Sequence, residues 1–343
     1  MKVGPPPSWL QVVLRLLYPP FAVLVTLAAL PLMVLGALLW PIDRRLRLTR
    51  VTFLAVYFMW EDVGVLLHCL FLSVRTPTDR GERWVRQHEE LVAHALDNFL
   101  RTAERWAGFH VVVDGELDLG DPSRPVVVLS RHAGPADSVA LAWLLGHRGG
   151  RVPRIVLAAG LLWDPGLAMV LKRLKAYFVP SRTGAGDDRT QGMQRLADHL
   201  GPRDALLMFP EGRNWTVHRQ EAEVARLSAE GESERAEQAA LWRWVLPPRY
   251  RGVQTILAAR PDADVTIIAH TGLELFDSPL DIWRGIPFGP DEGLLVRTTT
   301  YPAAEVPREP EAIVEWLDER WTEVNAWVEG HRTVRGSGHA ATP

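Results

Sequence analysis

The sequence has a single cysteine, Cys69, among its 343 residues. One thiol forms no disulfide within its own chain, which excludes a disulfide-stapled secreted scaffold, and the same count excludes a zinc site built on cysteines. The chain also has no excess of positive charge, because 38 Lys and Arg oppose 41 Asp and Glu for a formal net charge of -3. This balance argues against a nucleic-acid-binding protein, so we expect no nucleic acid as a partner.

The sequence also lacks the signatures of several large enzyme classes. It contains no G-x-S-x-G nucleophile elbow, no Walker A lysine loop, no H-E-x-x-H pair and no G-x-G-x-x-G after a strand. No group of His and Cys has the spacing of a metal site, so we expect no bound metal. These absences leave few of the common catalytic arrangements.

What the sequence has in abundance is an apolar run near its start. Residues 21–40 carry no charge, and at about 1.5 Å per residue such a helix is about 30 Å long, the thickness of a bilayer core. Pro19 and Pro20 precede this run, so residues 8–18 are predicted to form a separate short amphipathic helix in the membrane interface. A cleaved signal peptide is the alternative, but the run ends without a small-residue cleavage site.

A second apolar run, residues 51–74, contains the adjacent acids Glu61 and Asp62. Two acids at the midpoint of a span cost about 2.5–3.5 kcal/mol each on insertion scales unless they are paired. The basic loop at residues 43–50 favours the cytoplasmic side of a membrane. We therefore expect one span or a re-entrant hairpin, with the bulk of the protein in the cytoplasm.

The rest of the chain alternates short β-rich apolar runs with helical segments, a pattern typical of an α/β fold. We predict a central mixed sheet flanked by helices, preceded by an N-terminal membrane-embedded helical segment. Residues 1–75 form that segment, residues 76–330 form the α/β domain with a charged helical insertion at 215–246, and residues 331–343 form a disordered tail. The predicted strands are residues 126–129, 155–159, 176–179, 205–209, 265–269 and 294–299. The predicted helices are residues 79–107, 135–145, 164–175, 187–200, 219–244 and 309–329.

One candidate site follows the strand predicted at residues 126–129. His132 comes directly after this strand, and Asp137 lies five residues further on, in the opening of a helix. A carboxylate bonded to one imidazole nitrogen fixes the tautomer and supports a general base that acts on a substrate hydroxyl. A helix-capping Asp beside a surface His is the alternative, because the same spacing often arises by chance.

A second candidate segment follows the strand predicted at residues 205–209. Pro210, Glu211 and Gly212 form a turn there, which presents Glu211 and Arg213 at the edge of the sheet where ligands of α/β folds bind. An ordinary turn with solvated charges is the alternative.

Together these segments resemble the glycerophospholipid acyltransferase family, which includes the 1-acylglycerol-3-phosphate acyltransferases. The family motif N-H-x-x-x-x-D is matched by His132 and Asp137, with Arg131 where Asn is usual. A second motif, an apolar strand that ends in Arg, resembles residues 176–182. The motif F-P-E-G-T-R is matched by Phe209, Pro210, Glu211 and Gly212, and Arg213 stands one place earlier than the arginine of the family. The resemblance covers roughly residues 80–300, and the charged insertion with residues 245–252 is similar to a long-insert branch of the family.

The resemblance implies an acyltransferase that uses acyl-CoA as a co-substrate, with no resident cofactor and no covalent enzyme intermediate. His132, oriented by Asp137, would deprotonate the hydroxyl of a lysophospholipid. The implied partners are this acceptor, acyl-CoA and membrane lipids, and the implied location is the cell membrane with the catalytic domain on the cytoplasmic face. The predicted substrate-binding residues are Arg182, Phe209, Pro210, Glu211, Gly212, Arg213, Arg249 and Arg251.

Three functions follow from these observations. The first is transfer of an acyl group to 1-acylglycerol-3-phosphate, giving phosphatidic acid, with Arg182 and Arg213 on the phosphate. The second keeps the chemistry but uses another lysophospholipid or a glycolipid, because Arg213 is displaced. The third is a membrane-anchored interaction protein with a degenerate site, which docks through the charged helix. Arg249 and Arg251 bind a phosphate under the first two, or belong to a solvated basic turn.

Overall fold

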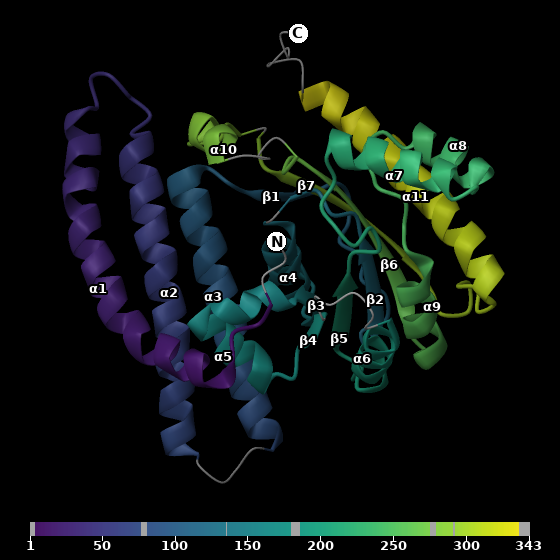
Figure 1. Cartoon of the computed structure of the whole chain (residues 1–343), viewed down its shortest axis with the longest axis horizontal. Helices are drawn as coiled ribbons and strands as arrows, with labels where there is room; N and C mark the ends of the chain where they lie inside the picture. Colours follow the sequence, from purple (N-terminus) through teal and green to yellow (C-terminus); the bar gives the residue numbers. More distant parts are fainter. Residues whose placement is uncertain are drawn as a thin grey trace. The chain divides into compact units, whose positions relative to one another are not determined.

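Figure 1 shows a computed structural model of the chain, which describes residues 4–76, 81–134, 136–179, 186–274, 279–290 and 292–335. The chain divides into two compact units. The first unit comprises Met1–His110, Val156–Arg189 and Trp283–Gly289, and the second comprises Val111–Ile155, Thr190–Ile282 and Pro290–Pro343. The predicted division at residues 75 and 330 stays a prediction.

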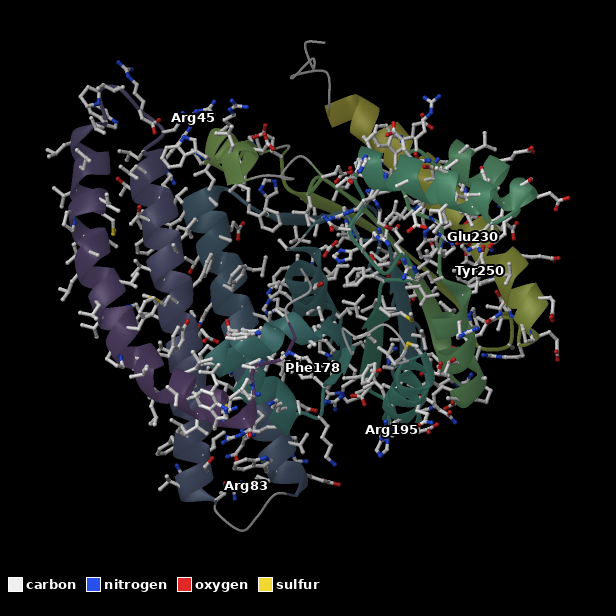
Figure 2. The ribbon with its side chains drawn as sticks, viewed as in Figure 1. Arg45, Arg83, Phe178, Arg195, Glu230 and Tyr250 are labelled. Carbon is white, nitrogen blue, oxygen red and sulfur yellow. The ribbon has the colours of Figure 1, made fainter. Side chains whose placement is uncertain are left out.

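Helices make up most of the first unit. They are α1 (Ser8–Leu38), α2 (Arg47–Arg75), α3 (Glu82–Ala107) and α5 (Pro165–Arg173), with the short 3-10 helix η2 (Ala159–Trp163) before α5. α2 packs against α1, α3 and α5, and Figure 1 shows α1 and α2 side by side. Figure 2 shows Arg45 in the turn that joins these two helices. Both α1 and α2 are long and apolar enough to cross a membrane.

The two acids of α2 have hydrogen-bond partners in the protein, which offset the free-energy cost of removing their carboxylates from water. The carboxylate of Asp62 accepts hydrogen bonds from the backbone N–H groups of Gly166 and Leu167, at 3.1 and 2.8 Å, at the N-terminus of α5. Glu61 accepts a bond of 3.1 Å from the side-chain amide of Asn98 in α3. A carboxylate at a helix N-terminus satisfies N–H groups that have no partner within the helix. The acidic side of α2 is therefore turned toward α3 and α5.

The prediction of a helix break at Pro19 and Pro20 was wrong. α1 is continuous from Ser8 to Leu38 and contains both of these prolines as well as Pro31. A proline removes one N–H donor and strains the preceding turn, but its fixed φ is compatible with a helix. Long apolar runs on both sides continue the helix through the two prolines.

A seven-stranded sheet has the order β1-β7-β6-β2-β5-β3-β4. All pairings are parallel except β6 with β7, so the sheet is mixed, as predicted. β2, β5 and β6 are buried along their whole length. The apolar sequences of β2 and β5 fit this burial, whereas β6 also carries buried polar residues. The strands are β1 (Val111–Val113), β2 (Val126–Ser130), β3 (Val152–Ala158), β4 (Tyr177–Val179), β5 (Asp204–Met208), β6 (Asp264–Thr271) and β7 (Leu294–Tyr301).

Helices of the second unit contact the sheet and one another. α11 (Pro310–Arg335) contacts β6 and α9 (Tyr250–Ala259), and α7 (Val217–Ala229) contacts α8 (Ser233–Leu241). α4 (Asp137–Trp143) follows β2 and continues into the π-helical turn η1 (Leu144–Arg148). The remaining helices are α6 (Gly186–Asp198) and α10 (Pro279–Gly285). Because β5, β2 and β6 are parallel neighbours, their carboxyl ends meet at one edge of the sheet.

Several elements differ from the predictions. The charged insertion is not one helix at 219–244 but the pair α7 and α8, which are separated at Gly231, a residue with a φ of 81°. A left-handed φ at this glycine ends the first helix. β1, α9 and α10 were not predicted, and α11 continues to Arg335. The rest of the predicted tail, residues 336–343, lies outside the described residues.

Candidate active site

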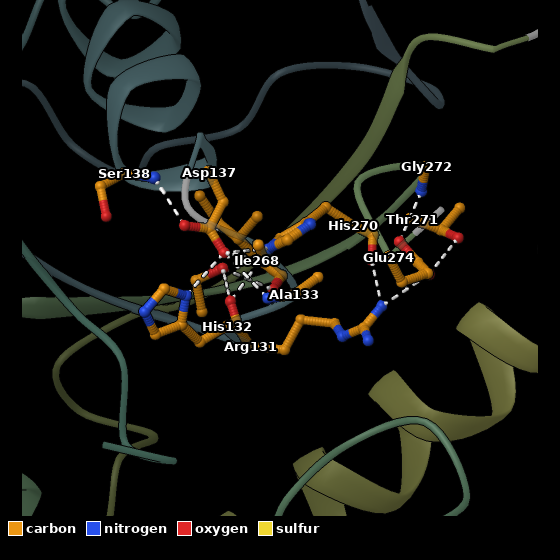
Figure 3. A network of polar contacts seen from close by, with 12 residues as sticks. Arg131, His132, Ala133, Asp137, Ser138, Ile268, His270, Thr271, Gly272 and Glu274 are labelled. Carbon is orange, nitrogen blue, oxygen red and sulfur yellow. Dashed lines mark hydrogen bonds and ion pairs between the residues drawn. The ribbon is translucent and has the colours of Figure 1, made fainter. Parts of the chain in front are cut away.

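His132 and Asp137 meet at the carboxyl end of β2. His132 lies two residues after this strand, Asp137 is the first residue of α4, and the turn between them brings His132 Nδ1 to 2.8 Å from Asp137 Oδ2 (Figure 3). The His132 side chain is 23% exposed, whereas Asp137 is fully buried. The imidazole is therefore held at Nδ1 by a buried carboxylate and is partly open to solvent.

Asp137 is fixed by the backbone around it. Its Oδ2 also accepts from the N–H groups of Ala133 and Gly134, at 2.8 and 3.1 Å, and its Oδ1 accepts from that of Ser138 at 2.7 Å. Burial acts to raise the pKa of Asp137, but the bond with His132, the two nearby imidazoles and the Gly134 N–H outweigh it and hold the pKa below its usual value. The ionised carboxylate therefore accepts a hydrogen bond from the protonated Nδ1 of His132. The other ring nitrogen, Nε2, then carries a free lone pair.

The segment after β5 is attached to His132 at two points. The Phe209 ring stacks on the His132 imidazole, with ring centroids 4.5 Å apart and planes inclined by 26°. Further along, the Trp215 N–H donates to the His132 carbonyl. Between them, Gly212 closes a turn by donating to the Phe209 carbonyl at 3.0 Å, with a φ of 70° that favours glycine. The structure thus brings both sequence motifs to one place.

Glu211 lies in this segment but points inward. It is only 2% exposed. Burial raises the pKa of Glu211 to about 8, against the lowering effects of the Arg131 charge, the His132 and Leu246 N–H groups and the Trp321 indole. Glu211 therefore carries a proton at neutral pH and lies beneath the His132 loop. Its predicted contact with substrate stays a prediction.

Replacing Glu211 by glutamine tests this buried proton. A folded-state pKa of about 8, above the ordinary 4.5, means that the folded protein holds a proton that the unfolded chain has lost between these pH values. The contribution of Glu211 to the free energy of unfolding is fully present below pH 4.5. It decreases by about 1.4 kcal/mol per pH unit as the pH rises from there toward 8. Glu211→Gln has no such proton, so its Tm should rise relative to wild type between about pH 5 and 8. Thermal unfolding in detergent across this range, with the exposed Glu237→Gln as control, measures the difference. A Tm difference that does not change with pH would contradict the assignment.

Three arginines share one carboxylate near this segment. Glu223 of α7 forms ion pairs with Arg213, Arg226 and Arg249, with N–O distances of 3.3, 2.8 and 3.7 Å. The backbone N–H of Arg249 also donates to the Pro210 carbonyl at 2.9 Å. Two of the predicted phosphate ligands, Arg213 and Arg249, are therefore brought together by a residue of the insertion.

The other two predicted arginines are not part of this group. Arg251 is exposed on α9 and makes no ion pair with any residue that the structure describes. Arg182 lies outside the described residues.

Sequence reasoning missed the contacts of four residues, Arg131, Glu223, His270 and Glu274. Arg131, which was noted only as a substitution for Asn, is fully buried and forms an ion pair of 3.1 Å with Glu274. His270 of β6 is also fully buried, and its Nε2 lies 3.9 Å from Asp137 Oδ2. Glu223, His270 and Glu274 carried no local motif, so only the fold could associate them with His132.

Comparisons with known proteins found a matching family model and a similar solved structure. Residues 110–239 match the model of the Acyltransferase family, a range that contains both motifs. The fold is similar to the crystal structure of the 1-acyl-sn-glycerophosphate (LPA) acyltransferase PlsC from Thermotoga maritima, with a TM-score of 0.52 and 15% sequence identity. That similarity covers 81% of this chain and 95% of the other. A comparison with curated protein sequences found no match.

Proposed function

We propose that this chain is an acyltransferase of the glycerophospholipid acyltransferase family and that it transfers the acyl group of an acyl-CoA to the hydroxyl of 1-acylglycerol-3-phosphate. The product is phosphatidic acid. The observation that carries the proposal is the 2.8 Å contact of His132 Nδ1 with the buried Asp137 carboxylate, within the segment that matches the family. The match of residues 110–239 to the Acyltransferase family model supports an enzyme rather than an interaction protein with a degenerate site.

The proposed reaction needs one general base. Nε2 of His132 takes the proton of the acceptor hydroxyl as its oxygen attacks the thioester carbonyl carbon. The new C–O ester bond forms, the C–S bond breaks, and the CoA thiolate leaves with the proton returned by the imidazolium. The Asp137 carboxylate stabilises the imidazolium between these two proton transfers. Acyl-CoA is a co-substrate in this scheme, and no metal or resident cofactor takes part.

Arg213 and Arg249 supply the proposed phosphate site. The group around Glu223 has three guanidinium charges against two carboxylates, because Glu230 also pairs with Arg226, and three minus two leaves a net charge of +1. Guanidinium groups bind phosphate oxygens in a fixed fork geometry. Arg213 belongs to the segment that contacts His132 through Phe209 and Trp215. A phosphate bound by Arg213 would therefore have a fixed position relative to the base.

A second acceptor class has its own support. Arg213 and Arg249 already share the carboxylate of Glu223, which reduces what they gain from a phosphomonoester. An acceptor without a phosphomonoester, such as another lysophospholipid or a glycolipid, would bind without direct contacts from these two arginines to a phosphate.

We also propose that the first unit attaches the protein to the cell membrane, with the catalytic domain on the cytoplasmic face. α1 exposes large apolar side chains along its length, including Trp9, Leu16, Leu24 and Leu38. α2 binds α3 and α5 through its two acids, which supports a hairpin that dips into the bilayer rather than two independent spans.

Acyl transfer by the detergent-purified protein tests the proposed function. Radiolabelled acyl-CoA is offered with lysophosphatidic acid, lysophosphatidylinositol or a glycolipid, and the product is separated by thin-layer chromatography. We expect product from lysophosphatidic acid. Product only from another acceptor would move the protein to the second class, and no product from a folded protein would overturn the proposal.

The same panel tests the phosphate site. Arg213→Ala and Arg249→Ala should each raise the KM for lysophosphatidic acid about tenfold or more, because a hydrogen bond to a charged group contributes about 1.5–3 kcal/mol. The kcat should change little, since these groups bind the phosphate equally before and during the reaction. The exposed Arg243→Ala is the matched control. An unchanged KM in both variants would exclude the two arginines from the acceptor site.

A further inference from the structure

Two reciprocal hydrogen bonds join the ends of β2 and β6 behind the dyad. Arg131 Nη1 donates to the His270 carbonyl at 2.8 Å, and His270 Nε2 donates to the Arg131 carbonyl at 2.9 Å (Figure 3). Each residue thus uses its side chain to hold the backbone of the other. Burial lowers the pKa of His270, which keeps its imidazole neutral with Nε2 as the donor.

Glu274 completes this arrangement. Its Oε1 lies 3.1 Å from Arg131 Nη1 and accepts from the Thr271 hydroxyl at 2.7 Å, while Oε2 accepts from the Gly272 N–H at 2.8 Å. The side chains of Arg131 and Glu274 are 0% and 1% exposed. A buried charge of this kind is tolerated only with its partner, so the two residues depend on each other. We call Arg131, His270 and Glu274 the clamp.

The clamp is adjacent to the catalytic candidates but cannot reach a substrate. Arg131 directly precedes His132, so the carbonyl that His270 holds belongs to the peptide that leads into the base. His270 Nε2 also lies 3.9 Å from Asp137 Oδ2, on the buried side of the carboxylate. All three clamp residues are buried, whereas the His132 side chain is partly exposed.

We propose that Arg131, His270 and Glu274 are positioning residues for His132. They fix the backbone at residue 131, so that Nδ1 of His132 stays on Asp137 and Nε2 faces the acceptor. An error of about 1 Å in such a group costs about 10²-fold in rate, which is the effect that the clamp prevents. The kinetic part of this inference rests on the proposed acyl transfer. Its structural part does not.

The ion pair is tested by removing both charges together. A single change such as Glu274→Gln leaves a buried guanidinium without its partner and can unfold the protein, whereas a double apolar replacement of a buried pair is often tolerated. We expect Arg131→Met with Glu274→Met to fold, with kcat for acyl transfer reduced about 10²-fold and KM within about threefold of wild type. A double variant with the kcat of wild type would overturn the positioning role and leave the pair a structural feature only.

His270 offers a matched pair of variants. In His270→Gln the amide nitrogen takes the place of Nε2 and can still donate to the Arg131 carbonyl, whereas His270→Leu has no donor. We expect the Gln variant to keep kcat within about threefold of wild type and the Leu variant to lose about 10²-fold. Equal activities in the two variants would contradict the role of this bond.

A spectroscopic readout separates the clamp from the proposed function. In protein labelled with ¹⁵N-histidine, the His132 signals are those missing from the His132→Ala spectrum among the eleven histidines. We expect one neutral tautomer with the proton on Nδ1 in wild type, and a mixture of tautomers in the double Met and His270→Leu variants. If wild type transfers no acyl group to any acceptor, the proposed function fails while the tautomer still tests the clamp. An unchanged tautomer in both variants would overturn the clamp.

Discussion

Replacing His132 by alanine should reduce kcat for acyl transfer by about 10³-fold, within the range of about 10²–10⁴ that a positioned general base contributes. The variant removes the only ring nitrogen that faces away from Asp137 in the dyad, so the acceptor hydroxyl must attack while it still carries its proton. The KM for the acceptor should change little, because the phosphate contacts proposed at Arg213 and Arg249 are intact. Initial rates at saturating acyl-CoA, measured over a range of acceptor concentrations, give both parameters.

The fold should survive this substitution. Asp137 loses one of its partners but keeps the N–H groups of Ala133, Gly134 and Ser138. The far-UV circular dichroism and the Tm should therefore stay close to those of wild type. His218→Ala, an exposed histidine on α7, is the matched control and should keep full activity. Retention of more than about a tenth of the wild-type kcat in His132→Ala would exclude His132 as the base.

The sheet and the dyad could be predicted because their signals are local. Buried parallel strands have continuous apolar sequences, and β2 and β5 were found for that reason. His132 and Asp137 are five residues apart at the end of such a strand, so a single turn decides their contact. The three-residue strand β1 is too short to produce a comparable pattern.

The remaining parts of the site depend on contacts between distant segments. Arg131 and Glu274 are 143 residues apart in the chain and meet only because β6 lies next to β2. Glu223 and Arg249 are 26 residues apart and meet because the chain returns after α8 to the segment that follows β5, where the Arg249 N–H donates to the Pro210 carbonyl. Strand order and helix direction are set by tertiary packing, which the local pattern does not encode.

Replacing Asp137 by asparagine should have an effect nearly as large as the loss of His132. The two side chains have the same shape, but the amide can place only one oxygen where the carboxylate uses two as acceptors. If that oxygen faces His132, Ala133 and Gly134, the amide NH₂ meets the Ser138 N–H, and if it is turned round, the NH₂ meets the other three donors. Either arrangement removes the negative charge that stabilises the imidazolium, so we expect kcat to decrease by about 10²–10⁴-fold.

The Tm difference between Asp137→Asn and wild type should depend on pH, because the variant lacks the carboxyl whose pKa is lowered by folding. Because the folded-state pKa of Asp137 is lowered, its contribution to stability is present above its ordinary pKa of 3.8 and is lost as the pH falls through the folded value. The Tm of Asp137→Asn should therefore lie below that of wild type at neutral pH, and the difference should shrink in acid. A Tm difference that grows in acid would contradict a lowered pKa.

The double variant decides whether the two residues act as one unit. When a base and the carboxylate that orients it work together, removing the second after the first costs little more, because the group that it orients is already gone. We therefore expect His132→Ala with Asp137→Asn to have the kcat of His132→Ala alone, within about threefold. If the carboxylate contributed by an independent route, for example by binding the substrate itself, the two losses would multiply. A double variant at least about tenfold slower than His132→Ala would therefore replace the dyad by two separate contributions.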